Sequence, residues 1–143
     1  WRIPVYREVQ RSTTAMDNRI VKLVGIPWVL GGRDYTGADC VGLFLLAQRD
    51  LFSRPIQGEW LYDEATYADM SHTIPGELLR LGFSEAPFPA MDGDAIVIRI
   101  ARHMHLGTVV AGHLLQTAEN GKSAWGRLPR SGSRVTLYRY VRG

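Results

Sequence analysis

The sequence predicts a single α+β domain in which one buried helix packs on an antiparallel β-sheet. Helical patterns occupy the chain up to about residue 81, and short β-branched runs follow from residue 95. Helices first and strands afterwards is an order typical of α+β domains. The chain has 143 residues, which is the size of one ordinary domain. Since no internal repeat, low-complexity tract or linker divides the sequence, we expect one domain over 1–143.

The helical segments are identified by the spacing of their apolar residues. Residues 12–24 begin with serine and threonine, which are good helix caps, and then place apolar side chains on one face. Residues 41–52 (VGLFLLAQRDLF) are apolar on almost every side, as in a buried helix. Two short helices are expected around 63–70 and 76–81. Three glycines in 27–40 (PWVLGGRDYTGADC) predict a tightly turning loop before the buried helix.

Four short runs in the second half of the chain predict strands. They are rich in β-branched and aromatic residues and lie between turn residues. These runs are 95–100 (AIVIRI), 105–112 (HLGTVVAG), 113–117 (HLLQT) and 133–141 (SRVTLYRYV). Because a turn at Ala111–Gly112 joins the second run to the third, these two are expected to pair as a hairpin within an antiparallel sheet.

The composition excludes several classes of protein. A charged fraction of 22% and a hydrophobic fraction of 45% are typical of a globular protein. No apolar run reaches the roughly 20 residues of a membrane helix, so we expect no membrane insertion. One cysteine excludes internal disulfides and argues against a cysteine-rich zinc site, so neither a metal nor a cofactor is expected. The arginine-rich segment 127–142 alternates like a strand, so we expect no specific nucleic-acid partner.

The position of Cys40 is the most informative feature of the sequence. Lone cysteines in globular domains usually fill space in the core. Cys40, however, follows the glycine-rich loop and stands at the expected start of the buried helix, with Asp39 in the capping position. A helix N-terminus offers unpaired amides and a partial positive charge, which favour a thiolate and can bind an oxyanion. This position favours a reactive thiol.

A nucleophilic thiol needs a base, and the chain has four histidines. We expect His72, in a polar segment, to lie on the surface. His105 is expected at the start of a strand, where Gly107 leaves space beside its ring. The predicted hairpin brings the side-chain carbonyl of Gln116 close to that ring, which it can orient. We therefore predict Cys40 as the nucleophile, His105 as the base and Gln116 as the orienting residue.

Three segments in the same order carry a resemblance to a known family. PWVLGGRDYTGADCVGL, DGDAIVI and HLGTVVAGHLLQ resemble the NlpC/P60 family of cysteine peptidases, which act on bacterial cell walls. The resemblance runs from about Pro27 to Gln116. Its most specific part is the G-x-D-C-x-G sequence from Gly37 to Gly42. The resemblance implies a papain-like core, with the nucleophile helix packed on an antiparallel sheet.

The resemblance also implies roles for individual residues. Cys40 and His105 match the nucleophile and the general base of the family. Gln116 stands where the family places a third polar residue, frequently histidine. Trp28 matches a position often held by a tyrosine of the oxyanion hole. Its indole N–H could also donate a hydrogen bond, but at a different distance from the backbone than the hydroxyl of a tyrosine. Val41 replaces a serine that is common after the family's cysteine.

Two charged residues near the nucleophile have alternative interpretations. Asp39 and Arg33 are placed to meet the ammonium and carboxylate groups of a substrate. Equally, Asp39 is placed to cap the helix, and Arg33 to be a solvated charge of the loop. The residue types and their spacing leave both interpretations open.

The resemblance implies a peptidoglycan hydrolase, a thiol protease that cleaves an amide of the stem peptide through an acyl-enzyme. The bond most often cleaved in the family joins γ-D-glutamate to a diamino acid. The compact layout is similar to that of phage-tail peptidase domains, which would make other tail proteins partners besides peptidoglycan. A secreted or effector-type cell-wall amidase and a catalytically silent structural tail domain are the alternatives. We expect an extracytoplasmic or virion-associated location, although the first residues, from Trp1, lack a signal-peptide pattern.

Overall fold

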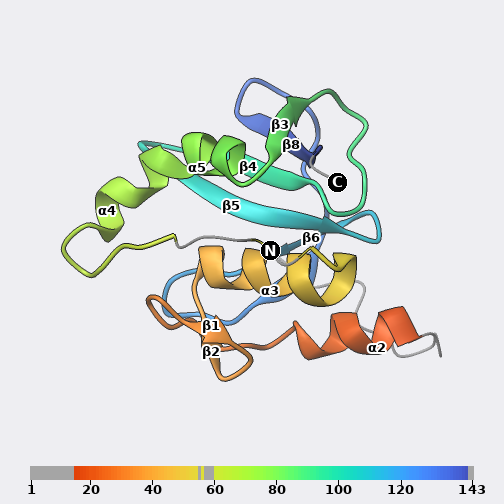
Figure 1. Cartoon of the computed structure of the whole chain (residues 1–143), viewed down its shortest axis with the longest axis horizontal. Coiled ribbons are helices and arrows are strands. Elements are labelled where there is room, and N and C mark those ends of the chain that lie inside the picture. The colour runs from red at the N-terminus through yellow and green to blue at the C-terminus, as the bar shows by residue number, and fades with distance from the viewer. Residues whose placement is uncertain (1–14, 55, 57–59, 142–143) are drawn as a thin grey trace.

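The computed structural model describes residues 15–54, 56 and 60–141 and has the expected α+β architecture (Figure 1). A small hairpin of β1 (Arg33–Asp34) and β2 (Gly37–Ala38) precedes the longest helix. None of the described helices combines the length and the apolar character that crossing a membrane requires. The helical elements are α2 (Ala15–Lys22), α3 (Cys40–Phe52), α4 (Tyr67–Met70), the 3₁₀ turn η1 (Ser71–Thr73) and α5 (Ile74–Arg80).

The main sheet has six antiparallel strands in the order β3-β8-β4-β5-β6-β7. Strands β4, β5 and β6 each pair with the next strand along the chain, whereas β7 lies at the edge and β8 returns to lie between β3 and β4. This order puts β5 inside the sheet, between β4 and β6. The strands are β3 (Phe83–Ala86), β4 (Ala95–Ile100), β5 (His103–Val110), β6 (His113–Gln116), β7 (Ala124–Gly126) and β8 (Val135–Tyr140).

Most of the predicted elements are confirmed. The predicted strands at 95–100, 113–117 and 133–141 are β4, β6 and β8. The strand predicted at 105–112 is β5, which begins earlier, at His103, because its first residues pair with the end of β4. The sequence did not predict β3 and β7, because segments of 4 and 3 residues are too short to show alternation.

The predicted helices differ from the observed ones mainly at their ends. The buried helix expected over 41–52 is α3. The helix expected over 12–24 is α2, which ends at Lys22; residues 12–14, with the predicted caps, lie outside the described residues. In place of the helix expected at 63–70, only the last turn forms, as α4. The helix expected at 76–81 begins earlier, at Ile74, because Pro75 is favourable in a first helical turn.

Helix α3 occupies the centre of the domain because two of its sides are covered. One side contributes Leu43, Leu46 and Ala47 to an apolar cluster with α2, β5 and β6. Another side contributes Val41 and Phe44 to a cluster with α5, β4 and β5. In Figure 1, α3 accordingly lies between the sheet and α2. Burial on both sides explains why its sequence is apolar nearly all round.

The glycine-rich loop packs directly against the first turn of α3. A Cβ on Gly42 would lie 1.9 Å from the carbonyl oxygen of Gly32, and a Cβ on Gly32 would lie 2.3 Å from that of Gly37. Glycine is therefore required at Gly32 and Gly42 by the close approach of two backbones. This contact holds the start of α3, and with it Cys40, against the loop.

Replacing Gly42 by alanine should separate these two backbones. We expect Gly42→Ala to lower the free energy of unfolding by about 1–3 kcal/mol, as overpacking does in other cores. Urea denaturation measures this change. The matched control is Gly76→Ala, since a Cβ at this exposed position in α5 meets no atom within 4 Å. Equal stability of the two variants would contradict the proposed backbone contact.

Candidate active site

Cys40 is the first residue of α3 and directly follows the capping residue Asp39. The Cys40 side chain is 7% exposed and forms no disulfide. The backbone amides of Val41 and Leu106 donate hydrogen bonds toward its sulfur. Leu106 lies in β5 just before the residues that pair with β6, so its amide is available to the thiol. The thiol is thus held between the start of the helix and the middle of the sheet.

Burial dominates the electrostatics of the thiol and raises the pKa of Cys40 to about 12. The negative charge of Asp39 adds to this shift, while the amides of Val41 and Leu106 oppose it. The expectation that the helix N-terminus favours a thiolate is therefore wrong for the resting protein, because desolvation and a neighbouring carboxylate outweigh the amides. The thiol is neutral at rest and needs a base in order to react.

His105 and Gln116 are brought together by the β5–β6 hairpin, as the sequence predicts. Nε2 of His105 lies 2.6 Å from Oε1 of Gln116. Because an amide oxygen only accepts hydrogen bonds, Nε2 carries the proton and Nδ1 is the basic nitrogen. Burial lowers the pKa of the His105 imidazole, and the hydrogen bond to Gln116 opposes this shift. The ring is therefore neutral at neutral pH, which is the form that accepts a proton.

Cys40 and His105 line the same cavity, which has a volume of about 480 Å³. The α4–η1 segment contributes Tyr67 and Ser71 to its lining, and Met104 of β5 lines it next to His105. The cavity wall therefore contains a thiol, an imidazole and two hydroxyl groups. This is the arrangement that acyl transfer through a thioester requires.

Tyr67 is a site residue that the sequence analysis missed, and it changes the interpretation of Trp28. Tyr67 lines the cavity with Cys40, whereas Trp28 is not among the residues found in its wall. The Trp28 and Tyr67 rings meet edge to face, with centroids 5.7 Å apart. Burial and the charges of Cys40 and Asp39 raise the pKa of the Tyr67 hydroxyl, and a hydrogen bond from Trp28 opposes the shift. The phenol at the cavity thus stays protonated, and Trp28 supports it.

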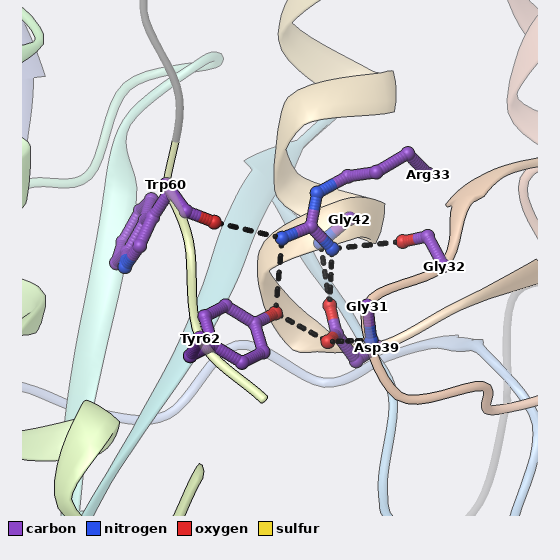
Figure 2. A network of polar contacts seen from close by, with 7 residues as sticks. All are labelled: Gly31, Gly32, Arg33, Asp39, Gly42, Trp60 and Tyr62. Atoms are coloured by element: carbon purple, nitrogen blue, oxygen red, sulfur yellow. Dashed lines mark hydrogen bonds and ion pairs between the residues drawn. The ribbon is translucent and has the colours of Figure 1, made fainter. Parts of the chain in front are cut away.

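Asp39 lies at the centre of a buried network of polar contacts (Figure 2). Asp39 is completely buried, with 0% of its surface exposed to solvent. Oδ1 accepts hydrogen bonds from the amide of Gly42 at 2.9 Å and from Nη1 of Arg33 at 3.0 Å. Oδ2 accepts from the amide of Gly31 at 2.7 Å and from the hydroxyl of Tyr62. The capping interpretation of Asp39 is therefore confirmed, and the buried carboxylate has no surface to offer a substrate.

Arg33 connects this network to a distant segment of the chain. Its guanidinium donates to the carbonyl oxygens of Gly32 at 2.9 Å and Trp60 at 3.1 Å, and to the hydroxyl of Tyr62 at 3.2 Å. The charge of Arg33 neutralises Asp39, and its side chain is not in the wall of the Cys40 cavity. Its observed role, linking the loop to the segment 60–62, was not predicted.

The aromatic segment 60–67 (WLYDEATY) was the available signal for Tyr62 and Tyr67. Three of its residues are aromatic, but an aromatic side chain in a polar segment does not reveal which neighbour it meets. Of the other histidines, His72 is exposed, which confirms the prediction that it lies on the surface, and His103 lines the cavity that holds Cys40. Within the described ranges, no group of three or more His, Cys, Asp or Glu side chains is arranged to hold a metal ion.

Removing the Asp39 carboxylate should destabilise the fold strongly. Asp39→Ala leaves Arg33 and the amide of Gly42 without their buried partner, so we expect a loss of about 3–5 kcal/mol in the free energy of unfolding. Tyr62→Phe removes one donor and should cost about 1–2 kcal/mol. Urea denaturation checks both, with the exposed Asp69→Ala as control. An Asp39→Ala protein as stable as the control would show that the network does not stabilise the fold.

The raised pKa of Cys40 should be visible in its alkylation. With a pKa of about 12, little thiolate exists at neutral pH, so iodoacetamide should label native Cys40 slowly between pH 6 and 9. The rate should still rise above pH 9, whereas the same chain unfolded in urea should level off near the ordinary thiol pKa of ~8.5. Mass spectrometry follows the labelling. Rapid, pH-independent labelling near pH 6 would instead indicate a thiolate–imidazolium pair at rest.

Comparison with known proteins identifies a shared fold. No family model and no curated protein matches the sequence. Similar solved structures include the crystal structure of the NlpC/p60 domain of the peptidoglycan hydrolase SagA, with a TM-score of 0.53 and 14% sequence identity. The superposition covers 89% of this chain and 97% of the SagA domain. The likeness thus extends over nearly the whole of both chains, and the protein has the α+β, papain-like fold of NlpC/P60 domains.

Proposed function

We propose that this protein is a cysteine hydrolase of peptidoglycan, with Cys40 as nucleophile and His105 as general base. The observation that carries the proposal is the cavity itself: a thiol at a helix start and a histidine oriented by Gln116 line the same wall. The likeness of fold to the NlpC/p60 domain of a peptidoglycan hydrolase supports the choice of substrate. Together these features favour cleavage of an amide in the peptide part of the cell wall.

The first step is the attack of sulfur on the carbonyl carbon of the amide. Because the pKa of Cys40 is raised and that of His105 is lowered, thiol and imidazole are both neutral at rest. Nδ1 of His105 accepts the thiol proton as the carbon–sulfur bond forms, and then delivers it to the amine that leaves. Gln116 keeps the imidazole in the tautomer that this transfer needs. Water, deprotonated by His105, then hydrolyses the thioester.

The oxyanion of the tetrahedral intermediate needs donors close to the sulfur. The amides at the start of α3 are the first candidates, since helix N-termini present unpaired N–H groups. The Tyr67 hydroxyl is the second, because its raised pKa keeps it a donor and it lies in the cavity wall. Trp28 would act through Tyr67, to which its indole N–H donates. This replaces the direct role for Trp28 that the resemblance implied.

The rim of the cavity suggests what flanks the amide that is cleaved. Glu64 and Glu119 are exposed and line the cavity that holds Cys40. Two carboxylates there favour a substrate with a free ammonium group, such as that of a stem peptide with a diamino acid. We propose the bond from γ-D-glutamate to the diamino acid as the one cleaved, and an extracytoplasmic or virion-associated site of action. The resemblance of the sequence to phage-tail peptidase domains supports association with a phage tail.

A catalytically silent structural domain is the second candidate function. The observation that favours it is the burial of Cys40, which is only 7% exposed. This burial raises the pKa of the thiol and so strongly disfavours the thiolate. The Gln116–His105 contact argues for turnover, since a silent domain has no need of an oriented imidazole.

Digestion of purified peptidoglycan tests the proposal. The wild type should release stem-peptide fragments, Cys40→Ala should release none, and His105→Ala should be slower by about 10²–10⁴-fold. Mass spectrometry of the soluble fragments identifies the bond. The control is His72→Ala, which replaces an exposed histidine and should retain full activity.

Two outcomes of this digestion would contradict the proposal. Fragment release by Cys40→Ala would place the chemistry elsewhere in the molecule. The absence of release by the wild type, over walls with several kinds of stem peptide, would favour the silent structural domain.

A further inference from the structure

A second cavity adjoins the one that holds Cys40 and carries two arginines in its wall. It has a volume of about 130 Å³ and is lined by Arg99 and Arg134 among other residues. Met104 belongs to the walls of both cavities, and Pro75 of α5 lies on one side of the smaller one. The two cavities therefore adjoin each other at the side chain of Met104.

The register of the sheet explains why these side chains meet. Arg99 in β4 is directly opposite Met104 in β5. On its other side, the amide of Arg99 donates to the carbonyl oxygen of Arg134 at 2.8 Å, just before β8 begins. Residues opposite one another in an antiparallel pair lie on the same face. Two steps further in, Val97 and Thr136 form the next opposed pair of this face.

The two guanidiniums form a positive site whose charge the protein leaves largely unbalanced. Like charges on directly opposed residues are destabilising. Neither Arg99 nor Arg134 takes part in an ion pair within the described part of the chain, and the guanidinium of Arg99 donates a hydrogen bond to the carbonyl oxygen of Ser133, at 3.2 Å. Glu85, opposite Tyr138, brings one carboxylate to the far end of this face. A bound anion would offset the repulsion between the arginines.

The donors around the smaller cavity are those that suit a carboxylate. Arg99 and Arg134 present planar guanidiniums, which match carboxylates with two parallel hydrogen bonds. The hydroxyl groups of Thr136 and Tyr138 add two neutral donors in the same wall. The volume of about 130 Å³ is enough for a carboxylate and the carbon that bears it.

We propose that the cavity lined by Arg99 and Arg134 is a subsite for a free carboxylate carried by the peptide whose amide lies at Cys40. The inference rests on the proposed hydrolase function and adds a specificity to it. A substrate that extends from Cys40 past Met104 reaches the arginines with a group beyond the scissile bond. The subsite therefore selects stem peptides whose carboxylates are free over those in which they are amidated.

Matched synthetic stem peptides test this specificity. One peptide has its carboxyl groups free, and its partners have one of them at a time converted to a carboxamide. The wild type should show kcat/KM about tenfold higher for the free carboxylate that binds the arginines, the size expected for one charge-assisted contact. Arg99→Gln and Arg134→Gln should each reduce this preference through KM, and the double variant should abolish it with kcat unchanged.

The control variant is Arg19→Gln, which removes the same charge from α2, on the far side of α3 from the sheet (Figure 1). It should keep the full preference. Equal cleavage of all the peptides by the wild type, or a preference that survives in the double variant, would overturn the subsite and leave the hydrolase standing.

Calorimetric binding of the same peptides to Cys40→Ala separates failure of the subsite from failure of the enzyme. Tighter binding of the free carboxylate, lost in the Arg99→Gln, Arg134→Gln background, supports the subsite whether or not cleavage occurs. Carboxylate-dependent binding without cleavage by the wild type would overturn the hydrolase alone. Absence of both binding and cleavage would overturn both proposals.

Discussion

The buried carboxylate of Asp39 is the interaction on which the rest of the site depends. It receives donors from the glycine-rich loop, from the first turn of α3 and, through Tyr62, from a segment more distant in the chain. Removing a charge from water costs several kcal/mol unless the charge is paired and hydrogen-bonded. Because the salt bridge to Arg33 and the other three donors meet that requirement jointly, the three segments hold one another in place. Cys40, the next residue, takes its position from this arrangement.

The same carboxylate also affects the chemistry of the thiol. Its negative charge adds to the effect of burial and raises the pKa of Cys40. The carboxylate that stabilises the start of α3 therefore also disfavours the thiolate form of Cys40. The interaction that positions the thiol thus lowers its reactivity. A neutral thiol resists oxidation, since susceptibility follows thiolate character and exposure. Reaction then depends on His105, whose own pKa is lowered by burial and which is ready to accept a proton.

Aromatic contacts connect the Asp39 network to the cavity. Tyr62 donates to Asp39 on one side and lies against Tyr67 on the other, with ring centroids 5.8 Å apart. Tyr67 in turn contacts Trp28 of the loop and lines the cavity wall. Residues 60–67 are thus part of the site, and their position depends on the pairing of Asp39 with Arg33. Changes in this segment should affect the cavity even where they do not touch Cys40.

The sequence by itself determined the fold class, the order of the main elements and the candidate nucleophile and base. These features are local: α3 follows from an apolar run after a glycine-rich loop, and β5 and β6 from short runs on either side of a tight turn. The contact between His105 and Gln116 was predictable for the same reason, since one hairpin joins them.

Only the tertiary structure decided which residues surround Cys40 and how they change its chemistry. Tyr67 reaches the cavity, and Tyr62 reaches Asp39, across separations in sequence that carry no periodic pattern. Strands β3 and β7 are too short to be recognised alone and exist because β8 and β6 pair with them. The sequence predicted a lowered pKa for Cys40, which is the wrong direction. The helix N-terminus, which lowers the pKa of a thiol, can be recognised in the sequence. The burial that outweighs it depends on how the whole domain packs.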